Sequence, residues 1–319
     1  MQEILSKMEI SYKEKVPLCQ FTGMNIKGVI PLIAYPDTYE KLFHLCKYVA
    51  SNKLTYEIIG GATNTYFCEG FTRDIVIVVR HLSNIDFHDD GSFTVESGYN
   101  LTKLSKQMVL KGYVGFEGLV GIPGTVGAAV INNSGAFGCD MESIVRECQL
   151  LSMKKGELVT FSQKELCFSP RYSSLKGNNN FCLLNITFNA PHKKVSTEEL
   201  QTIMNQNMKI RRTAIDGKRK SLGTVFVAST MCELYKRNRF ALFIWKILDI
   251  PNKLFFHRSN WSLYLQFLCL RHPELAKHCD SIGRFCWEKG TTEADFFYYI
   301  NTMQSLAGGK LKLEIELKK

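Results

Sequence analysis

The sequence predicts an α+β fold that is divided into more than one domain. With 319 residues, the chain is too long for one small core and suits two or three domains. Segments with helical periodicity alternate with short apolar segments typical of strands, and two glycine-rich stretches interrupt them. From about residue 212 the amino-acid composition changes: a loop rich in Lys and Gly leads into an aromatic-rich region. We therefore place a boundary near 205–215, between a glycine-rich half and a smaller C-terminal domain.

Helices and strands are expected to alternate along the N-terminal half. The segment 38–52 carries apolar side chains at 42, 43, 45, 46 and 49, which suits an amphipathic helix. Asn100 can cap the next helix, and Ser196 followed by Glu199 forms a capping-box pattern ahead of a third. The expected helices cover 38–52, 100–111 and 196–211, and the expected strands cover 56–59, 74–80, 92–98, 144–152, 157–161 and 182–190, with 144–152 and 157–161 forming a hairpin.

The C-terminal domain is expected to be rich in helix. The segment GTVFVAS at 223–229 precedes an aromatic-rich region, 240–270, whose pattern predicts helix throughout. A helix at 292–306, the turn AGGK and a strand over 311–317 are expected to close the domain.

Composition argues against a membrane-spanning or secreted protein. Hydrophobic residues make up 45% and charged residues 22% of the chain, which is ordinary for a globular protein. No run of about 18 uncharged apolar residues appears, so neither a membrane span nor a membrane partner is expected. The first residues lack the apolar stretch and cleavage site of a secretory signal, which predicts a cytoplasmic location.

The cysteine spacing and the net charge indicate which metal sites and which partners to expect. The 11 cysteines form no CxxC pair and no ligand spacing, so reduced thiols are expected and no metal site. The net charge of +10, with basic clusters at 207–220 and 235–239, fits either a solvated face or a substrate with phosphates or carboxylates. A nucleic-acid partner is not expected, because no nucleic-acid-binding motif accompanies the charge.

The first glycine-rich turn is GGATN at 60–64, directly after an expected strand. Its two glycines allow positive φ and a close approach of the backbone to a ligand. The following N–H groups, the Thr63 hydroxyl and the Asn64 amide can form a concave site for an anion such as a pyrophosphate. A simple turn without a ligand is the alternative.

The second glycine-rich region, GFEGLVGIPGTVGAAVINNSGAFG at 115–138, holds seven glycines in 24 positions. It is neither a P-loop nor a G-x-G-x-x-G fingerprint, because the Lys-Ser/Thr pair and the glycine spacing are missing. Pro123 fixes one φ angle and so gives the loop a defined shape. The small residues at 127–129 would let a flat ring or a phosphate lie against the backbone, although a tightly turned loop without a ligand has equal weight.

In this order, the two regions resemble the UDP-N-acetylenolpyruvoylglucosamine reductase family, which has GGGSN followed by GIPGTVGGA and NAGAYG. The resemblance covers about 25–228 and 283–317, whereas 235–280 does not align. It implies an FAD-binding fold of the vanillyl-alcohol-oxidase type with two subdomains, about 1–80 and 81–210, and a substrate-binding domain over 211–319. It also implies that FAD is held by Gly60, Gly61, Ala62, Thr63, Asn64, Gly118, Gly121, Ile122, Pro123, Gly124, Thr125, Gly127, Ala128, Asn133, Gly135 and Gly138.

The resemblance also implies three catalytic residues. The family motif F-x-Y-R-x-S corresponds to FSPRYS at 168–173, which keeps the arginine as Arg171 and has Pro170 in place of the tyrosine. The family segment RR…GS-x-F-K-N-P corresponds to Arg-Arg at 211–212 and GTVFVAS, so the catalytic serine is replaced by Thr224 and Lys-Asn-Pro by 227–229. The motif L-x-x-E-V places Glu316 in the acidic position, and SIGRF at 281–285 replaces Lys-His-x-x-Phe.

The implied reaction passes hydride from NADPH through FAD to the vinyl carbon of an enolpyruvyl ether on a UDP-sugar. Arg171 would stabilise the enolate-like charge that develops, Thr224 would donate a proton, and Glu316 would assist. A monomer or weak oligomer is expected. Two alternatives stay open: a related reductase of another enolpyruvyl- or keto-nucleotide sugar, and a catalytically weak flavin-binding protein.

Overall fold

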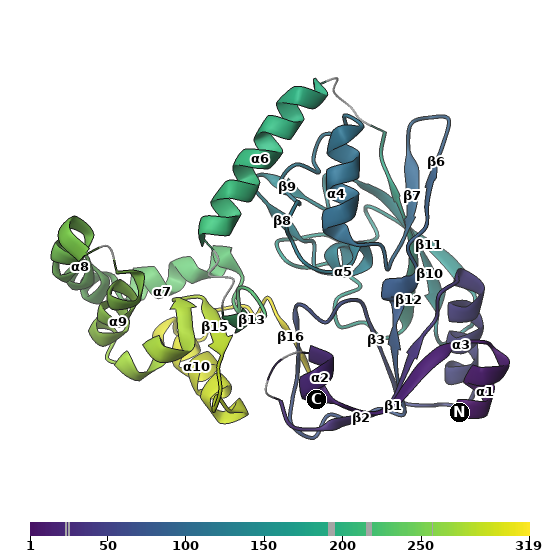
Figure 1. Ribbon diagram of the computed structural model, residues 1–319, viewed down its shortest axis with the longest axis horizontal. Helices are drawn as coiled ribbons and strands as arrows, with labels where there is room; N and C mark the ends of the chain where they lie inside the picture. The colour runs from purple at the N-terminus through teal and green to yellow at the C-terminus, as the bar shows by residue number, and fades with distance from the viewer. Residues whose placement is uncertain (23, 25, 191–194, 215–218, 257) are drawn as a thin grey trace. The chain divides into compact units, whose positions relative to one another are not determined.

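The chain, seen in a computed structural model, is described over residues 1–22, 24, 26–190, 195–214, 219–256 and 258–319 (Figure 1). It divides into two compact units. The first comprises 1–17, 29–63 and 72–215, and the second comprises 18–28, 64–71 and 216–319. The functional division into 1–210 and 211–319 stays a prediction.

The first unit contains a four-stranded sheet in the order β1-β2-β5-β3. The strand β1 pairs antiparallel with β2, while β2, β5 and β3 run parallel. Apolar side chains of one face of the helix α3 are buried in a core that includes Ile75 and Ile77 of β5. The elements are α1 (Gln2–Lys7), β1 (Ser11–Pro17), β2 (Val29–Tyr35), α3 (Tyr39–Ser51), β3 (Tyr56–Ile59), β5 (Ile75–Val78) and η1 (Val79–His81).

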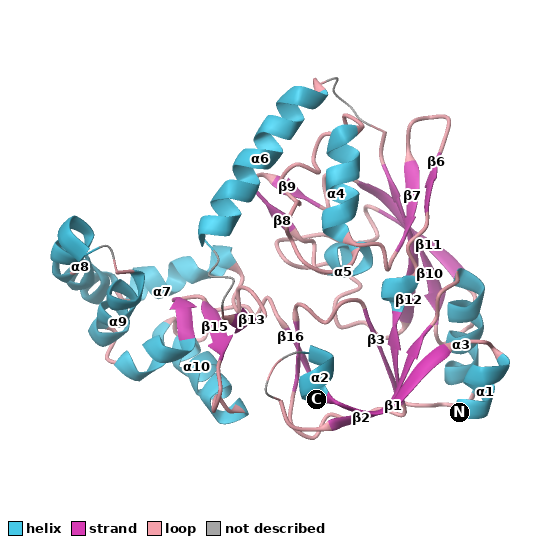
Figure 2. Cartoon of the chain, viewed as in Figure 1, coloured by secondary structure: helices cyan, strands magenta, loops and turns pink. Residues whose placement is uncertain are grey.

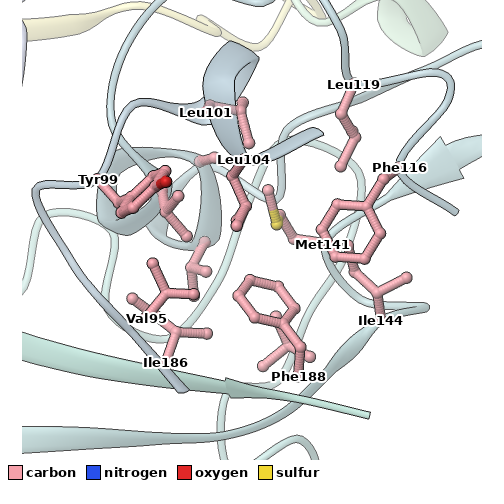
Figure 3. Close-up of a cluster of buried hydrophobic side chains, with 14 of the residues drawn as sticks. Val95, Tyr99, Leu101, Leu104, Phe116, Leu119, Met141, Ile144, Ile186 and Phe188 are labelled. Atoms are coloured by element: carbon pink, nitrogen blue, oxygen red, sulfur yellow. The ribbon is translucent and has the colours of Figure 1, made fainter. Parts of the chain in front are cut away.

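The same unit contains a five-stranded antiparallel sheet in the order β11-β10-β12-β7-β6. Its core joins Leu104 of α4 and Phe116 to Phe188 of β12, as Figure 3 shows. Short β-strands at 135–136 and 139–140 form a small ladder of their own. The elements are β6 (Ile85–Phe87), β7 (Phe93–Glu96), α4 (Leu101–Leu110), α5 (Val126–Ile131), β8 (Gly135–Ala136), β9 (Cys139–Asp140), β10 (Val145–Ser152), β11 (Leu158–Ser162), β12 (Phe181–Phe188) and α6 (Thr197–Ala214).

The second unit combines helices with two small sheets (Figure 2). One sheet has the order β13-β15-β14, and in the other β16 pairs parallel with β4. Aromatic rings fill its core, with Tyr66 stacked on Trp287 at 5.2 Å between ring centroids and 4.7 Å from Phe296. The elements are α2 (Leu18–Thr22), β4 (Thr65–Phe67), β13 (Lys220–Ser221), η2 (Ala228–Thr230), α7 (Met231–Arg237), α8 (Arg239–Leu248), η3 (Asn252–Phe256), α9 (Ser259–Cys269), η4 (Pro273–His278), β14 (Cys279–Ser281), β15 (Arg284–Trp287), α10 (Glu293–Leu306) and β16 (Glu316–Lys318).

Most of the expected elements are confirmed. The Asn100 side chain accepts a hydrogen bond from the amide of Lys103 at 2.9 Å, as a helix cap does. Ser196 accepts one from the amide of Glu199 at 3.2 Å at the start of α6. The hairpin of β10 and β11, the helix α10 and the strands β3, β5, β7 and β12 lie where they were expected.

The structure corrects two expectations about the C-terminal domain. The region 240–270 is largely helical but is not one continuous helix, because α8 ends at Leu248, the π-helical segment η3 covers Asn252–Phe256, and α9 begins at Ser259. Pro251 has no N–H to donate and interrupts the regular helix there. The strand expected over 311–317 is confined to Glu316–Lys318, with an isolated bridge at Leu313.

Within the described part of the chain, no helix has the length and apolar character needed to cross a membrane. No group of three or more His, Cys, Asp or Glu side chains among the described residues could hold a metal ion. All 11 cysteines are free thiols, and seven of them are buried. Of the basic cluster at 207–220, residues 215–218 lie outside the described residues.

Candidate functional site

The two glycine-rich turns pack against each other in the first unit. The Thr63 hydroxyl donates a hydrogen bond to the carbonyl of Pro123 at 3.3 Å. A Cβ atom on Gly60 would lie 2.3 Å from the Oγ1 of Thr125, and one on Gly124 would lie 3.0 Å from the Oγ1 of Thr63. Side chains larger than hydrogen therefore cannot occupy these positions without moving the turns apart, which explains the glycines at both.

The first turn has the backbone of an anion site. Ala62 takes a φ of 54°, in the left-handed region that residues other than glycine rarely adopt. Among the described residues, no acceptor receives the amide hydrogens of Gly61, Ala62 or Thr63. Successive amides around a left-handed residue form a concave nest that binds anions. The arrangement fits a pyrophosphate, which is the group that the resemblance assigns to this turn.

The second turn is fixed by the loop between β7 and α4. The amide of Gly127 donates to the carbonyl of Ser97 at 2.8 Å, and a Cβ on Gly127 would lie 2.7 Å from the Cβ of Ser97. The amide of Leu101 donates to the carbonyl of Gly124 at 3.1 Å. Thr125 caps α5 by accepting from the amide of Ala128 at 3.3 Å. The backbone from 124 to 128 is thus held rigidly.

Asn133 and Gly135 shape the segment that follows α5. Asn133 has a φ of 40°, and its amide group donates to the carbonyl of Ser169 at 3.0 Å and accepts from the amide of Glu142 at 3.0 Å. Gly135 lets β8 approach β9, because a Cβ there would lie 2.4 Å from the carbonyl oxygen of Cys139. Both residues therefore organise the loop itself. Their contact with FAD stays a prediction.

Gly118, Gly121, Ile122, Pro123 and Gly138 complete the predicted set in this unit. A Cβ on Gly118 would lie 2.3 Å from the carbonyl oxygen of Ala136, so this glycine permits a close approach of two backbones. Ile122 packs against the core of the five-stranded sheet, and its carbonyl accepts from the Thr102 hydroxyl at 3.1 Å. Gly121 and Gly138 both have φ near +80°, a conformation that favours glycine.

The structure brings Arg171 to the glycine-rich region. Its guanidinium donates to the carbonyl of Gly135 at 2.7 Å and, at 3.4 Å, to that of Asn133. Arg171 itself has a φ of 60°, and Lys176 donates to its carbonyl at 3.1 Å. The segment that contains Arg171 is thus folded so that a cationic side chain lies beside the predicted flavin loop.

Arg211 is a second cation at this site, and sequence reasoning assigned it no role. Its guanidinium donates to the carbonyl of Gly118 at 3.3 Å and lies over the ring of Phe137 at 5.4 Å. Burial, and after it the nearby charge of Arg171, lowers the pKa of Arg211. The Nε of Arg211 is buried and has no hydrogen-bond partner among the described residues. The Arg-Arg pair at 211–212 is the sequence signal that could have identified it.

Thr224 and Glu316 both belong to the second unit. The amide of Glu314 donates to the carbonyl of Val225 at 2.9 Å, and Phe226 forms an antiparallel bridge with Leu313. Extending this register places Thr224 opposite Ile315, the residue before Glu316. The structure therefore brings these two predicted catalytic residues into neighbouring segments.

The side chains of this pair have distinct surroundings. The methyl group of Thr224 lies 3.7 Å from the position that a Cβ on Gly283 would take, so threonine is accommodated beside a residue without a side chain. Glu316 forms an ion pair with Lys318 at 3.2 Å, and both side chains are largely buried. The amide of Glu316 donates to the carbonyl of Asn64 at 2.9 Å. Asn64 is therefore hydrogen-bonded to β16 and belongs to the second unit, whereas the rest of the first turn belongs to the first unit.

Comparisons with known proteins bear on this site. A family profile described as an FAD binding domain matches residues 30–162, which contain both glycine-rich turns. The chain is 30% identical over 227 residues to the UDP-N-acetylenolpyruvoylglucosamine reductase of Lactobacillus helveticus (strain DPC 4571), covering 71% of this chain and 74% of that protein. It is 32% identical over 176 residues to the protein of that name from Streptococcus pneumoniae (strain JJA), covering 55% of this chain and 57% of the relative.

The fold has a counterpart among solved structures. The crystal structure of UDP-N-acetylenolpyruvylglucosamine reductase from Thermus caldophilus superposes with a TM-score of 0.65 at 20% sequence identity, covering 97% of this chain and 99% of that one. Together with the profile match, this confirms the predicted α+β FAD-binding fold and FAD as the cofactor.

Proposed function

This chain belongs to the UDP-N-acetylenolpyruvoylglucosamine reductase family, and we propose that it reduces UDP-N-acetylglucosamine-enolpyruvate to UDP-N-acetylmuramate with FAD and NADPH, in peptidoglycan precursor synthesis. One observation carries the proposal. The nest at Gly61–Thr63, whose amides have no acceptor among the described residues, packs against the rigid second turn, and two arginines bind the carbonyls of Gly118 and Gly135 in the same glycine-rich region.

The cofactor site fits FAD on three counts. The nest offers amide hydrogens to a pyrophosphate, the glycines at 60, 124 and 127 let the turns pack closely against neighbouring segments, and the two guanidiniums supply positive charge. FAD, when bound, supplies the two-electron redox chemistry. The protein supplies position and electrostatics. The residues from Gly60 to Asn64 and from Gly118 to Gly138 are the proposed contacts.

Arg171 is proposed to stabilise negative charge on the substrate. Reduction of an enolpyruvyl group at its terminal carbon places charge on the α-carbon and on the attached carboxylate. A guanidinium stays protonated at any working pH and can bind a carboxylate through two hydrogen bonds. Arg211, held over Phe137, adds a second positive charge near the same loop and is proposed to position Arg171 and the anionic groups.

Thr224 is proposed to donate the proton that the α-carbon requires. A threonine hydroxyl can donate a hydrogen bond and a proton as a serine hydroxyl does, and Gly283 leaves room for the extra methyl group. Glu316, fixed by Lys318, is proposed to assist this proton transfer through its carboxylate. Each role belongs to a residue that aligns with a position of the family pattern, with Thr224 in place of the serine.

The net positive charge and the free thiols support proposals for the substrate and for the cell compartment. A UDP-sugar and NADPH both carry phosphates, and basic residues near 209–220 and 236–239 are proposed to attract them. Because all the cysteines are free thiols, we propose a reducing, cytoplasmic environment. We also propose that the protein acts as a monomer or weak oligomer and binds no nucleic acid.

The test separates the two half-reactions. Purified protein should be yellow, and NADPH should bleach it without oxygen. Addition of UDP-N-acetylglucosamine-enolpyruvate should then restore the oxidised flavin spectrum and yield UDP-N-acetylmuramate. A reduced flavin that this sugar fails to reoxidise would reject the proposed substrate.

A second candidate is a related reductase for a different enolpyruvyl- or keto-nucleotide sugar. The replacements Pro170, Thr224 and 227–229, together with SIGRF at 281–285, favour it because they lie in the segments that the family uses at its substrate. The reduced enzyme offered a panel of such sugars would show reoxidation by another member of the panel. If no sugar reoxidises it, the third possibility, a catalytically weak flavin-binding protein, is favoured.

A further inference from the structure

The helices α8 and α9 form a hairpin in the part of the chain that the family pattern does not cover. They lie side by side at one end of the second unit (Figure 1). The buried carboxylate of Asp249 accepts hydrogen bonds from Ser262 at 2.7 Å and Asn252 at 3.0 Å. The Trp245 indole donates to the carbonyl of Ser262 at 2.9 Å. One face of α8 is therefore firmly attached to α9.

The opposite face of α8 is apolar and exposed. Phe240, Phe243, Ile244 and Ile247 follow the spacing i, i+3, i+4, i+7, which places them in one stripe along the helix. Phe240 is 74% exposed and Phe243 is 59% exposed. In a surface helix of a globular protein the apolar stripe normally faces the core. Here the stripe faces outward while Leu242, on the opposite face, is buried.

Neighbouring elements enlarge this surface. Leu254, between the two helices, is 65% exposed, and on α9 the spacing of Trp261, Tyr264 and Leu268 places three exposed side chains on one face. Trp261 stacks on Tyr264 at 5.5 Å between ring centroids. We call these side chains the apolar patch: Phe240, Phe243, Ile244, Ile247, Leu248, Ile250, Leu254, Trp261, Tyr264 and Leu268. Exposed apolar side chains in this number on two neighbouring helices indicate an interaction site, and the stripe of α8 contributes most of them.

The exposed charged side chains between residues 238 and 270 are all basic. Between residues 238 and 270 the sequence has a single acidic residue, Asp249, and its side chain is fully buried. Arg239, Lys246, Lys253 and Arg258 are all exposed, and the Nζ of Lys253 forms an ion pair with the Asp249 carboxylate at 3.6 Å. At 100° per residue, Arg239 and Lys246 lie next to each other along one flank of the stripe. The surface therefore combines apolar and aromatic side chains with a basic border.

We propose that the apolar patch docks this protein onto an anionic membrane surface. Helices that lie in the membrane interface have this composition, with Trp, Phe and Leu on the inserted face and Lys or Arg beside it. Tyr and Trp also prefer the headgroup level. A second copy of the chain fits less well, because it carries the same basic border and a net charge of +10 and would bring like charges together.

The helix lies on the membrane and does not cross it. The ten residues of α8 span about 15 Å, roughly half of the hydrocarbon thickness of a bilayer. The attraction to anionic lipid comes from the basic border and weakens with salt, whereas burial of the apolar patch does not. This proposal replaces the expectation from the sequence that no membrane is involved, and it does not depend on the proposed reaction.

Flotation with lipid vesicles tests the proposal on the full-length, FAD-loaded protein. Vesicles of phosphatidylcholine with about one third phosphatidylglycerol should carry the protein upward, and pure phosphatidylcholine vesicles should carry much less. The double substitution Phe243→Asp with Ile247→Asp should weaken binding at least tenfold, and Lys246→Glu should weaken it mainly at low salt. Leu158→Asp, at an exposed leucine of β11, is the matched control and should bind as the wild type does.

Each outcome of this experiment supports or overturns the membrane proposal. Far-UV circular dichroism of every variant checks that its helices are intact, and the exposed positions of the substituted side chains predict that they are. Failure of the wild type to float with anionic vesicles at low salt overturns the proposal, and so does unchanged flotation of the double variant. A concentration-dependent dimer that the double substitution dissociates, without vesicle binding, would show that a second copy occupies the apolar patch instead.

Discussion

Replacing Gly60 by alanine tests whether the two turns must touch to bind FAD. The three atoms nearest to an added Cβ all belong to the Thr125 side chain, at 2.3, 3.1 and 3.2 Å. Ordinary contact needs roughly 1 Å more than the shortest of these, and Thr125 cannot retreat because it is buried and caps α5. Overpacking of this size costs about 1–3 kcal/mol.

The expected effect appears mainly in cofactor affinity. Without FAD, the turns can relieve the overlap by moving apart, so the free energy of unfolding falls little. With FAD bound, the turns must come back together, and the strain opposes binding. The FAD dissociation constant, measured by titrating the apoprotein and following flavin fluorescence, should rise about 10- to 100-fold, at about 1.4 kcal/mol for each factor of ten.

A double-mutant cycle provides the control. Thr125→Gly removes all three clashing atoms. By itself it should lower the free energy of unfolding by only a few tenths of a kcal/mol, because glycine is an adequate helix cap. In the Thr125→Gly background, Gly60→Ala should then have little effect on FAD affinity. If Gly60→Ala binds FAD as the wild type does, or if the double variant is as weak as Gly60→Ala, the proposed apposition of the turns in the holoprotein is wrong.

Three further substitutions test the catalytic and electrostatic assignments. Arg171→Lys should slow substrate-dependent flavin reoxidation about 100-fold while NADPH still reduces the flavin, and equal loss of both steps in rapid-mixing measurements would contradict the assigned role. Thr224→Ala should slow reoxidation about 100-fold or more, whereas Thr224→Ser should preserve it; equal rates for Ala and Ser would remove Thr224 from proton transfer. Burial lowers the pKa of His278, which stacks on Phe285, so the unfolded state binds a proton more readily. The free energy of unfolding from denaturant titrations should therefore fall as pH drops below about 6.5, and His278→Asn should reduce this slope.

Arg211 adds a partly buried positive charge beside the glycine-rich region. Its guanidinium is partly buried, its Nε has no hydrogen-bond partner among the described residues, and burial together with Arg171 lowers its pKa. Two neighbouring cations repel each other and raise the free energy of the protein without ligand. An anion bound between or beside them relieves this repulsion, so the arrangement favours a phosphate- or carboxylate-bearing ligand.

Local sequence alone determined the secondary structure of most of the chain. The caps at Asn100 and Ser196, the hairpin of β10 and β11 and the apolar stripe of α3 depend on residues a few positions apart. Such short-range interactions leave periodic or capping patterns that can be read directly. The two glycine-rich motifs, with their order, similarly indicated FAD, because backbone that must accept positive φ or close approach needs glycine.

Only the tertiary structure decided which distant residues meet. Gly60 faces Thr125, Arg211 reaches Gly118 and Phe137, and β16 joins β4 beside Asn64 through contacts between segments far apart in the chain. The break between α8 and α9 likewise involves the bond from Ser262 to Asp249. The sequence also could not predict that the α8 stripe faces outward, because periodicity shows that a helix has an apolar face but not what covers that face. Long-range packing sets these features, and no local pattern records it.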